Sequence, residues 1–397
     1  QIFESYLLPY IFLFILISVL SLFKSDFIRV LLIILWLILI MQPIYLIYSN
    51  NFILKTAPHN FTAVAKIDNI YGMDEKILTT YDTFGWRSTG HNLKDLKNSD
   101  TKNIFIFHGA SALEQNFIDD KKTTTSLLQN YFFESENSIS VLNIGGSGQR
   151  AFHTLVSIQK LNKQIPSNTK ITYFNVLGGT DWNWATKALL ANPNRKSNPL
   201  INGNPLKTVD YFNPQFFILT DLIRAIMNNF NNKLNIETII DFEDQHKNVF
   251  KTYQLRKKFS LDESQLLIME GWYQEIILEL INVCNKKENI SCVFIDQPTS
   301  WTKGDFKSEK FLNTLWFTPS YTEMSLDPKS LIKISNKFNL KLEKIISQNK
   351  CNKCSFLKIS DLIDNPDYFY DDVHFNTYGA EKMFDIIKDY ILSNNLL

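Results

Sequence analysis

The chain has 397 residues, 45% of them hydrophobic and 14% aromatic, enough for one large or two ordinary domains with a sizeable core. Its formal net charge of +1 gives no electrostatic basis for binding nucleic acid, so we expect no nucleic-acid partner. The sequence contains no internal repeat and no low-complexity tract that would indicate a repeat architecture.

Two long uncharged stretches stand at the start of the chain, at residues 5–23 and 30–48. At about 1.5 Å per residue in a helix, each reaches roughly the 30 Å of a bilayer core. Both are apolar on all sides, which favours a transmembrane hairpin over residues 1–50 rather than a buried soluble hairpin. A signal peptide fits poorly, because the first stretch lacks a basic start and a small-residue cleavage site.

The turn between the two stretches, Lys24 to Arg29, carries two basic residues. The positive-inside rule therefore predicts a cytoplasmic turn, with both ends of the hairpin outside. We expect a protein of the inner (cytoplasmic) membrane, in contact with the lipid bilayer, whose soluble part faces the periplasm or the extracellular space.

Residues 51–100 are expected to form an irregular juxtamembrane segment, followed by alternating apolar strands and amphipathic helices. Such an alternation predicts an α/β fold of three layers, a parallel sheet covered on both faces by helices. The predicted strands cover residues 103–108, 139–144, 171–177, 291–296 and 355–359. The predicted helices cover residues 123–133, 152–161, 261–282, 330–346 and 377–392. A helical insertion is expected at about 185–260, where aromatic residues fit either a cap over a site or ordinary packing.

The four cysteines form two close pairs, Cys284 with Cys292 and Cys351 with Cys354. Each pair precedes or opens a predicted core strand, so all four can meet at the edge of the sheet where those strands begin. In an oxidising compartment we expect disulfides, of open connectivity. A zinc site is the alternative, although the first pair has the wrong spacing for a zinc knuckle.

Near the end of the chain, the segment DDVHFNTYG places Asp371 and His374 three residues apart, just before the last predicted helix. At that separation the carboxylate can fix the tautomer of the imidazole, which can then act as a general base. Far upstream, the strand in NIFIFHGASALEQ ends at Gly109, and Ser111 follows it at the edge of the sheet where ligands bind. The structural alternative is a serine that caps the next helix. Asp372 is expected to be a solvated loop charge.

A second loop, after the next predicted strand, is rich in glycine: Asn143 is followed by Gly145, Gly146 and Gly148. Residues without a Cβ atom let a substrate carbonyl approach the backbone. The loop lacks the lysine of a P-loop and the spacing of a dinucleotide motif. We therefore predict no cofactor and no metal at this site.

The segments HGASALEQ, NIGGSGQRAFHTL, LGGTDWNW and DDVHFNTYG, in this order and spacing, resemble the four sequence blocks of SGNH, or GDSL-like, hydrolases, in particular membrane-anchored bacterial members. FIDQP, at the end of the fourth predicted strand, resembles a common feature of that family. The resemblance covers roughly residues 82–392 and implies an SGNH-like domain over residues 101–397. That family has a flavodoxin-like parallel sheet in three layers, so the resemblance implies this fold class, preceded here by the two transmembrane helices.

Carried over from the family, the resemblance implies that Ser111 is the nucleophile, His374 its base and Asp371 the group that orients the base. It also implies an oxyanion hole made by the backbone amides of Ser111 and Gly148, together with the residue at position 180.

That position departs from the family pattern, because the third block reads GxND in the family and Gly178, Gly179, Thr180, Asp181 here. Thr180 thus stands where the family has the oxyanion Asn. A Thr hydroxyl reaches less far than an amide, and losing one such donor costs about 10² to 10³ in turnover. Three explanations stay open: Thr180 donates from a shifted backbone, Asn183 substitutes for it, or activity is weak.

The resemblance implies an extracytoplasmic esterase or O-acyltransferase that acts on acyl esters, above all acetyl esters, of a cell-surface glycan. Its partners would be that substrate and a membrane-bound acyltransferase or larger membrane complex. The alternative is a catalytically weak or inactive SGNH-like scaffold or glycan-binding subunit of such a complex. Thr180 favours this alternative, whereas Ser111, Asp371 and His374 oppose it.

Overall fold

The computed structural model describes the following residues, to which every statement below is confined: 62–67, 70–82, 85–90, 103–134, 139–166, 168–201, 238–240, 251–300, 320–321, 324–363 and 365–397. The chain divides into two compact units, and the described residues belong to the one formed by Lys55–Gly203 and Asn235–Leu397. The predicted cytoplasmic turn and the aromatic residues expected in the insertion lie outside the described residues.

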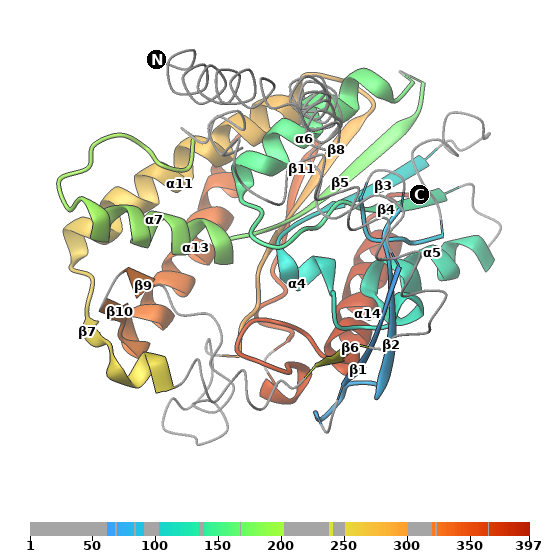
Figure 1. The fold of residues 1–397 in the computed structure, drawn as a ribbon. Coiled ribbons are helices and arrows are strands. Elements are labelled where there is room, and N and C mark those ends of the chain that lie inside the picture. Colours follow the sequence, from blue (N-terminus) through green and yellow to red (C-terminus); the bar gives the residue numbers. More distant parts are fainter. Residues whose placement is uncertain are drawn as a thin grey trace, which may run out of the picture. The chain divides into compact units, whose positions relative to one another are not determined.

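In the part of the chain described, the core is a sheet of five parallel strands (Figure 1). These strands are β3 (Asn103–His108), β4 (Ile139–Asn143), β5 (Lys170–Leu177), β8 (Ile290–Asp296) and β11 (Cys354–Leu357). Their order, β11-β8-β5-β3-β4, is the flavodoxin-like order, in which the first strand lies between the second and the third. All five predicted strands are confirmed, with ends shifted by at most two residues.

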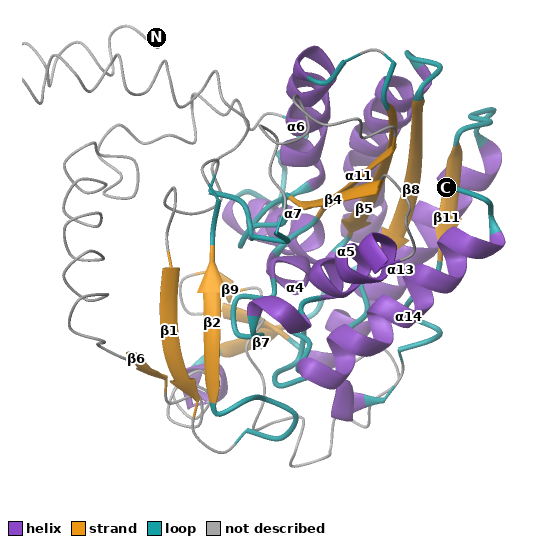
Figure 2. Cartoon of the chain, turned by 90° about the vertical axis from the view of Figure 1, so that its right-hand side faces the viewer, coloured by secondary structure: helices purple, strands orange, loops and turns teal. Residues whose placement is uncertain are grey.

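Helices cover both faces of this sheet (Figures 1 and 2). On one face, Phe105, Phe107 and Phe174 form a core with apolar residues of α5 and α14, and the rings of Phe107 and Phe174 stack with centroids 4.5 Å apart. Helices α6, α11 and α13 pack against one another over the other face. The bounds of the helices are α5 (Thr124–Glu134), α6 (Ala151–Gln164), α11 (Glu263–Asn285), α13 (Pro328–Gln348) and α14 (Thr377–Ser393). These five confirm the predicted helices.

The fold class is corrected in one respect. Among the described residues, no helix is long and apolar enough to cross a membrane, so the two predicted transmembrane helices are not part of the fold described. The residues predicted to form them, 5–23 and 30–48, lie outside the described residues. Even α11, with 23 residues, carries four glutamates, which a helix packed on a sheet tolerates and a bilayer core does not.

A strand hairpin lies within the segment that was expected to be irregular. Strands β1 (Thr62–Ile67) and β2 (Lys76–Thr80) pair antiparallel, and β6 (Thr238–Ile240) adds to β1. The carboxylates of Asp119 and Asp120 accept hydrogen bonds from the backbone of β2, at 3.0 Å each, which ties the hairpin to the core. The remaining short elements are η1 (Asp120–Lys122), β7 (Lys257–Phe259), β9 (Ser320–Tyr321), β10 (Met324–Leu326) and η3 (Pro366–Tyr368).

The cysteines pair locally, as Cys284–Cys292 and Cys351–Cys354. Cys292 and Cys354 are register partners on β8 and β11, so the two disulfides lie side by side. They stand where these parallel strands begin, at the edge opposite the strand ends that carry the candidate site. The expectation of disulfides is confirmed, and the open connectivity is resolved in favour of the two local pairs.

Candidate active site

The nucleophile candidate, Ser111, is the first residue of α4 (Ser111–Glu114), a single turn that directly follows β3. The N-cap residue of that turn is Ala110, so Ser111 does not cap the helix and its hydroxyl is available to another partner. Gly109 permits the sharp approach, because a Cβ atom there would lie 3.0 Å from the Cβ atom of Leu113. The structural alternative raised for Ser111 is thereby set aside.

The three residues of the predicted triad are brought together. The Oγ atom of Ser111 lies 2.6 Å from Nε2 of His374, and Nδ1 of His374 lies 2.6 Å from Oδ2 of Asp371. The other carboxylate oxygen of Asp371 accepts hydrogen bonds from the backbone N–H groups of Val373, at 2.9 Å, and His374, at 2.7 Å. The ring of Tyr370 stacks on the imidazole with centroids 5.5 Å apart. Asp371 therefore accepts the Nδ1 proton, which leaves Nε2 to accept the proton of Ser111.

Electrostatics favour a basic imidazole at this position. Burial lowers the pKa of His374, but the charge of Asp371 and its hydrogen bond, with smaller effects of Asp372 and Glu114, raise the pKa above its ordinary value.

Asp372 was expected to be a solvated loop charge, and this is wrong, because its side chain is fully buried. Its backbone carbonyl accepts hydrogen bonds from Ser300, at 3.1 Å from the backbone N–H and 3.2 Å from the hydroxyl.

The glycine-rich loop packs directly against the nucleophile turn. The backbone N–H of Gly146 donates to the carbonyl of Gly109 at 3.1 Å. A Cβ atom at Gly145 would come within 2.9 Å of both the Asn143 side chain and the backbone nitrogen of Glu114, so only glycine fits there. The loop thus approaches the nucleophile turn through backbone contacts; the approach of a substrate carbonyl to this loop stays a prediction.

Of the residues predicted to form the oxyanion hole, Thr180 lies in a pocket beside Ser111 and Gly148 does not. Thr180 lies in the first turn of α7 (Gly179–Ala191), a helix that was not predicted, after Gly178 with φ of +124°. It lines a pocket together with Ala110, the neighbour of Ser111. Gly148, with φ of +75°, lies on the exposed part of its loop and does not line that pocket.

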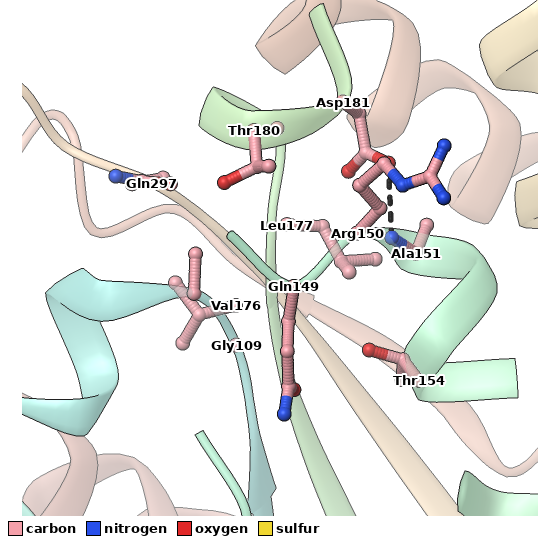
Figure 3. A pocket seen from close by; sticks show the side chains of 12 residues that line it. Gly109, Gln149, Arg150, Ala151, Thr154, Val176, Leu177, Thr180, Asp181 and Gln297 are labelled. Atoms are coloured by element: carbon pink, nitrogen blue, oxygen red, sulfur yellow. Dashed lines mark hydrogen bonds between the residues drawn. The ribbon is translucent and has the colours of Figure 1, made fainter. Parts of the chain in front are cut away.

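This pocket lies beside the nucleophile turn and holds about 200 Å³ of space, part of it open to solvent (Figure 3). Its walls come from the ends of β3, β5 and β8 and from the first turns of α6 and α7. The lining residues are Gly109, Ala110, Gln149, Arg150, Ala151, Thr154, Val176, Leu177, Gly178, Thr180, Asp181 and Gln297. Asn183, the suggested substitute for Thr180, is buried but does not line the pocket.

Two charged residues close the pocket on the side of α6. Asp181 accepts a hydrogen bond from the backbone N–H of Ala151 at 2.9 Å (Figure 3). Burial raises the pKa of Asp181 to about 6, although this hydrogen bond and the charge of Arg150 act against the shift. Arg150 is itself buried, and its guanidinium lies 4.6 Å from the centre of the Trp184 ring. Neither residue was singled out from the sequence, although both stand inside the quoted segments.

A buried carboxylate behind the nucleophile was also missed. Glu114 accepts hydrogen bonds from the hydroxyls of Tyr81, at 2.9 Å, and Ser147, at 2.7 Å. Burial raises the pKa of Glu114, and these two hydrogen bonds lower it again in part. Nearby, the fully buried Arg87 forms an ion pair with Asp120 at 3.1 Å. Arg87 also forms a β-bridge with Asn143, and its charge lowers the pKa of Glu114.

No family model and no curated protein matches this chain. It is similar to solved esterase structures. The psychrotrophic esterase EstA from Pseudoalteromonas sp. is 11% identical, with a TM-score of 0.33 over 75% of this chain and 100% of that one. The aryl esterase of M. smegmatis is 10% identical (TM-score 0.38, 74% and 99% covered). Est24, a carbohydrate acetylesterase from Sinorhizobium meliloti, is 8% identical (TM-score 0.37, 74% and 99% covered). Values this low assign neither a family nor a function to the chain.

Proposed function

We propose that this chain is a serine-dependent ester hydrolase or O-acyltransferase. The observation that carries the proposal is the continuous hydrogen-bond chain from Ser111 through His374 to Asp371, at 2.6 Å for each side-chain link. Nucleophile, base and orienting carboxylate in this arrangement are what acyl transfer requires.

The reaction proceeds in two halves. Ser111 Oγ attacks the ester carbonyl carbon while Nε2 of His374 takes the hydroxyl proton, and the imidazolium is stabilised by Asp371. The tetrahedral intermediate collapses, the C–O bond to the alcohol breaks, and the alcohol leaves with the proton from His374. Water, or the hydroxyl of an acceptor, then attacks the acyl-serine in the same way and releases the acyl group.

The proposed substrate is an ester of a short acyl group, such as acetate, on a glycan. The pocket beside Ala110 is small, which favours a short acyl group over a long chain. The two disulfides support an oxidising compartment, in which cell-surface glycans are exposed. Polar wall residues such as Gln149 and Arg150 suit a sugar hydroxyl better than a long acyl chain.

The test uses the purified chain and a chromogenic acetyl ester. We expect Ser111→Ala to reduce turnover to the uncatalysed background, and a fluorophosphonate to label Ser111 in the unmodified protein but not in the variant. Equal turnover by both proteins would refute the proposal.

A non-catalytic scaffold is the competing function, and Thr180 in place of an amide donor favours it. The two are separated in cells that lack the protein, by comparing the unmodified chain with Ser111→Ala. If the variant fully restores the phenotype, a binding role is correct and the enzymatic role is not.

A further inference from the structure

We propose that Gln297 supplies the amide donor of the oxyanion hole. It would take the role of the asparagine that the resembled family has at the position of Thr180. This inference rests on the proposed function, because it concerns the charge that develops when Ser111 attacks an ester.

The first observation is where Gln297 stands. It directly follows β8, and its backbone N–H donates to the carbonyl of Leu177 at 3.1 Å, which fixes its backbone at the carboxyl ends of β5 and β8. It lines the same pocket as Ala110 and Thr180. Figure 3 shows Gln297 and Thr180 on the same side of this pocket, with the nitrogen of the Gln297 amide turned away from Thr180.

The second observation is the state of its side chain. Gln297 is only 7% exposed, yet its amide makes no hydrogen bond in the described part of the chain. Neither amide atom is among the fully buried side-chain atoms of the described residues that lack a partner, so both are accessible, and Gln297 lines the pocket. The amide is therefore able to donate to a ligand bound there.

The third observation is that the neighbouring helix makes room for this amide. A Cβ atom at Gly179 would meet Oε1 of Gln297 first, and would lie 2.8 Å from Cδ and 3.0 Å from Nε2. Glycine at this position therefore lets the amide pack against the first turn of α7, whose next residue is Thr180. Rotation about the last side-chain bond exchanges Oε1 and Nε2, so the amide can present its N–H group to this wall, and with the Thr hydroxyl it then replaces one longer side chain.

The inference implies a specific kinetic pattern. A donor that acts on the oxyanion stabilises the transition state more than the bound ester, so its loss lowers kcat with little change in KM. Gln297→Met keeps the length of the side chain without a donor, and we expect kcat to fall about 10² to 10³-fold. Gly179→Ala displaces the amide without removing it, and we expect a loss in the same direction.

Two matched controls are available. Gly271, on α11, has open space where a Cβ atom would be added, so Gly271→Ala makes the same change without a clash. Gln348, exposed at the end of α13, serves for Gln348→Met. Both controls should keep the kcat of the unmodified protein, and all variants are compared by thermal unfolding.

A rescue experiment makes the assignment specific. Thr180→Asn introduces a new amide on the same wall. We therefore expect the double variant, Gln297→Met with Thr180→Asn, to have a kcat at least tenfold higher than that of Gln297→Met alone. The inference is wrong if turnover by the unmodified protein requires Ser111 and the kcat values of Gln297→Met and Gly179→Ala both stay within threefold of its kcat. Absence of Ser111-dependent turnover in the unmodified protein would overturn the proposed function as well, so the two failures are distinguishable.

Discussion

Asp371→Asn tests the tautomer of the catalytic imidazole. In the structure, one carboxylate oxygen accepts two backbone N–H groups, from Val373 and His374, and the other accepts Nδ1–H of His374. An asparagine must keep an oxygen toward the two backbone donors, so its NH₂ group has to face Nδ1. The imidazole then carries its proton on Nε2, where it can no longer accept the proton of Ser111.

The expected loss follows from this reversal. A wrong tautomer in a Ser-His-Asp site lowers kcat by about 10⁴, or about 5 kcal/mol of transition-state stabilisation. In the unmodified protein, activity should rise with pH as His374 loses its proton, at a pKa above the ordinary value. The rise should move to lower pH in the variant, because the charge that raises this pKa is gone.

The assay is the pH profile of acetyl-ester turnover, measured for the unmodified protein, Asp371→Asn and a control. Asp389→Asn removes the same charge from a side chain that is 72% exposed on α14, and it should leave the profile unchanged. If Asp371→Asn unfolds at the same temperature as the unmodified protein and keeps more than a tenth of its kcat, the argument from the tautomer is refuted.

Three further predictions concern Thr180, Asp181 and a disulfide. Thr180→Asn alone should leave turnover unchanged or raise it by up to about 10²-fold, measured as kcat; a large decrease would contradict an oxyanion role for that wall. Burial raises the pKa of Asp181 from 3.8 to about 6, so the folded state binds its proton more tightly. Stability should therefore fall by about 3 kcal/mol as pH rises through that window, and denaturant unfolding of Asp181→Asn should lack this component. Cys284→Ser opens the loop to Cys292 and should cost about 2–3 kcal/mol in the same assay; reduction should have no further effect at that pair.

The sequence was sufficient for the parts of the fold that follow from local pattern. Strand and helix periodicity predicted the parallel sheet, and the rule that ligands bind at the carboxyl ends of parallel strands placed Ser111 at that edge. The pairing of Ser111 with His374 was implied by the resemblance to a family with a Ser-His-Asp triad. The short hairpin β1–β2 was missed because its strands depend on hydrogen bonds to aspartates about 40 residues away. The burial of Asp372 was missed because charged residues are ordinarily exposed.

Site residues could be predicted where their contact is local in the sequence, as for Asp371 and His374, which stand three residues apart. Gln297 could not be found in this way, because its placement depends on the space left by Gly179, which is distant in sequence and adjacent only after folding. Thr180 differs from the Asn of the family that the sequence resembles, and the compensation that we propose for it depends on packing between α7 and the end of β8.

The separation of 263 residues between Ser111 and His374 has a consequence for biosynthesis. The strand before Ser111 lies inside the sheet, but the base arrives with the loop before α14, which is synthesised 263 residues later. A nascent chain therefore carries its serine for some time without a base to activate it. Under the proposed function, ester cleavage requires α14 to be in place on α5, so enzymatic activity also reports that the fold has formed as far as α14.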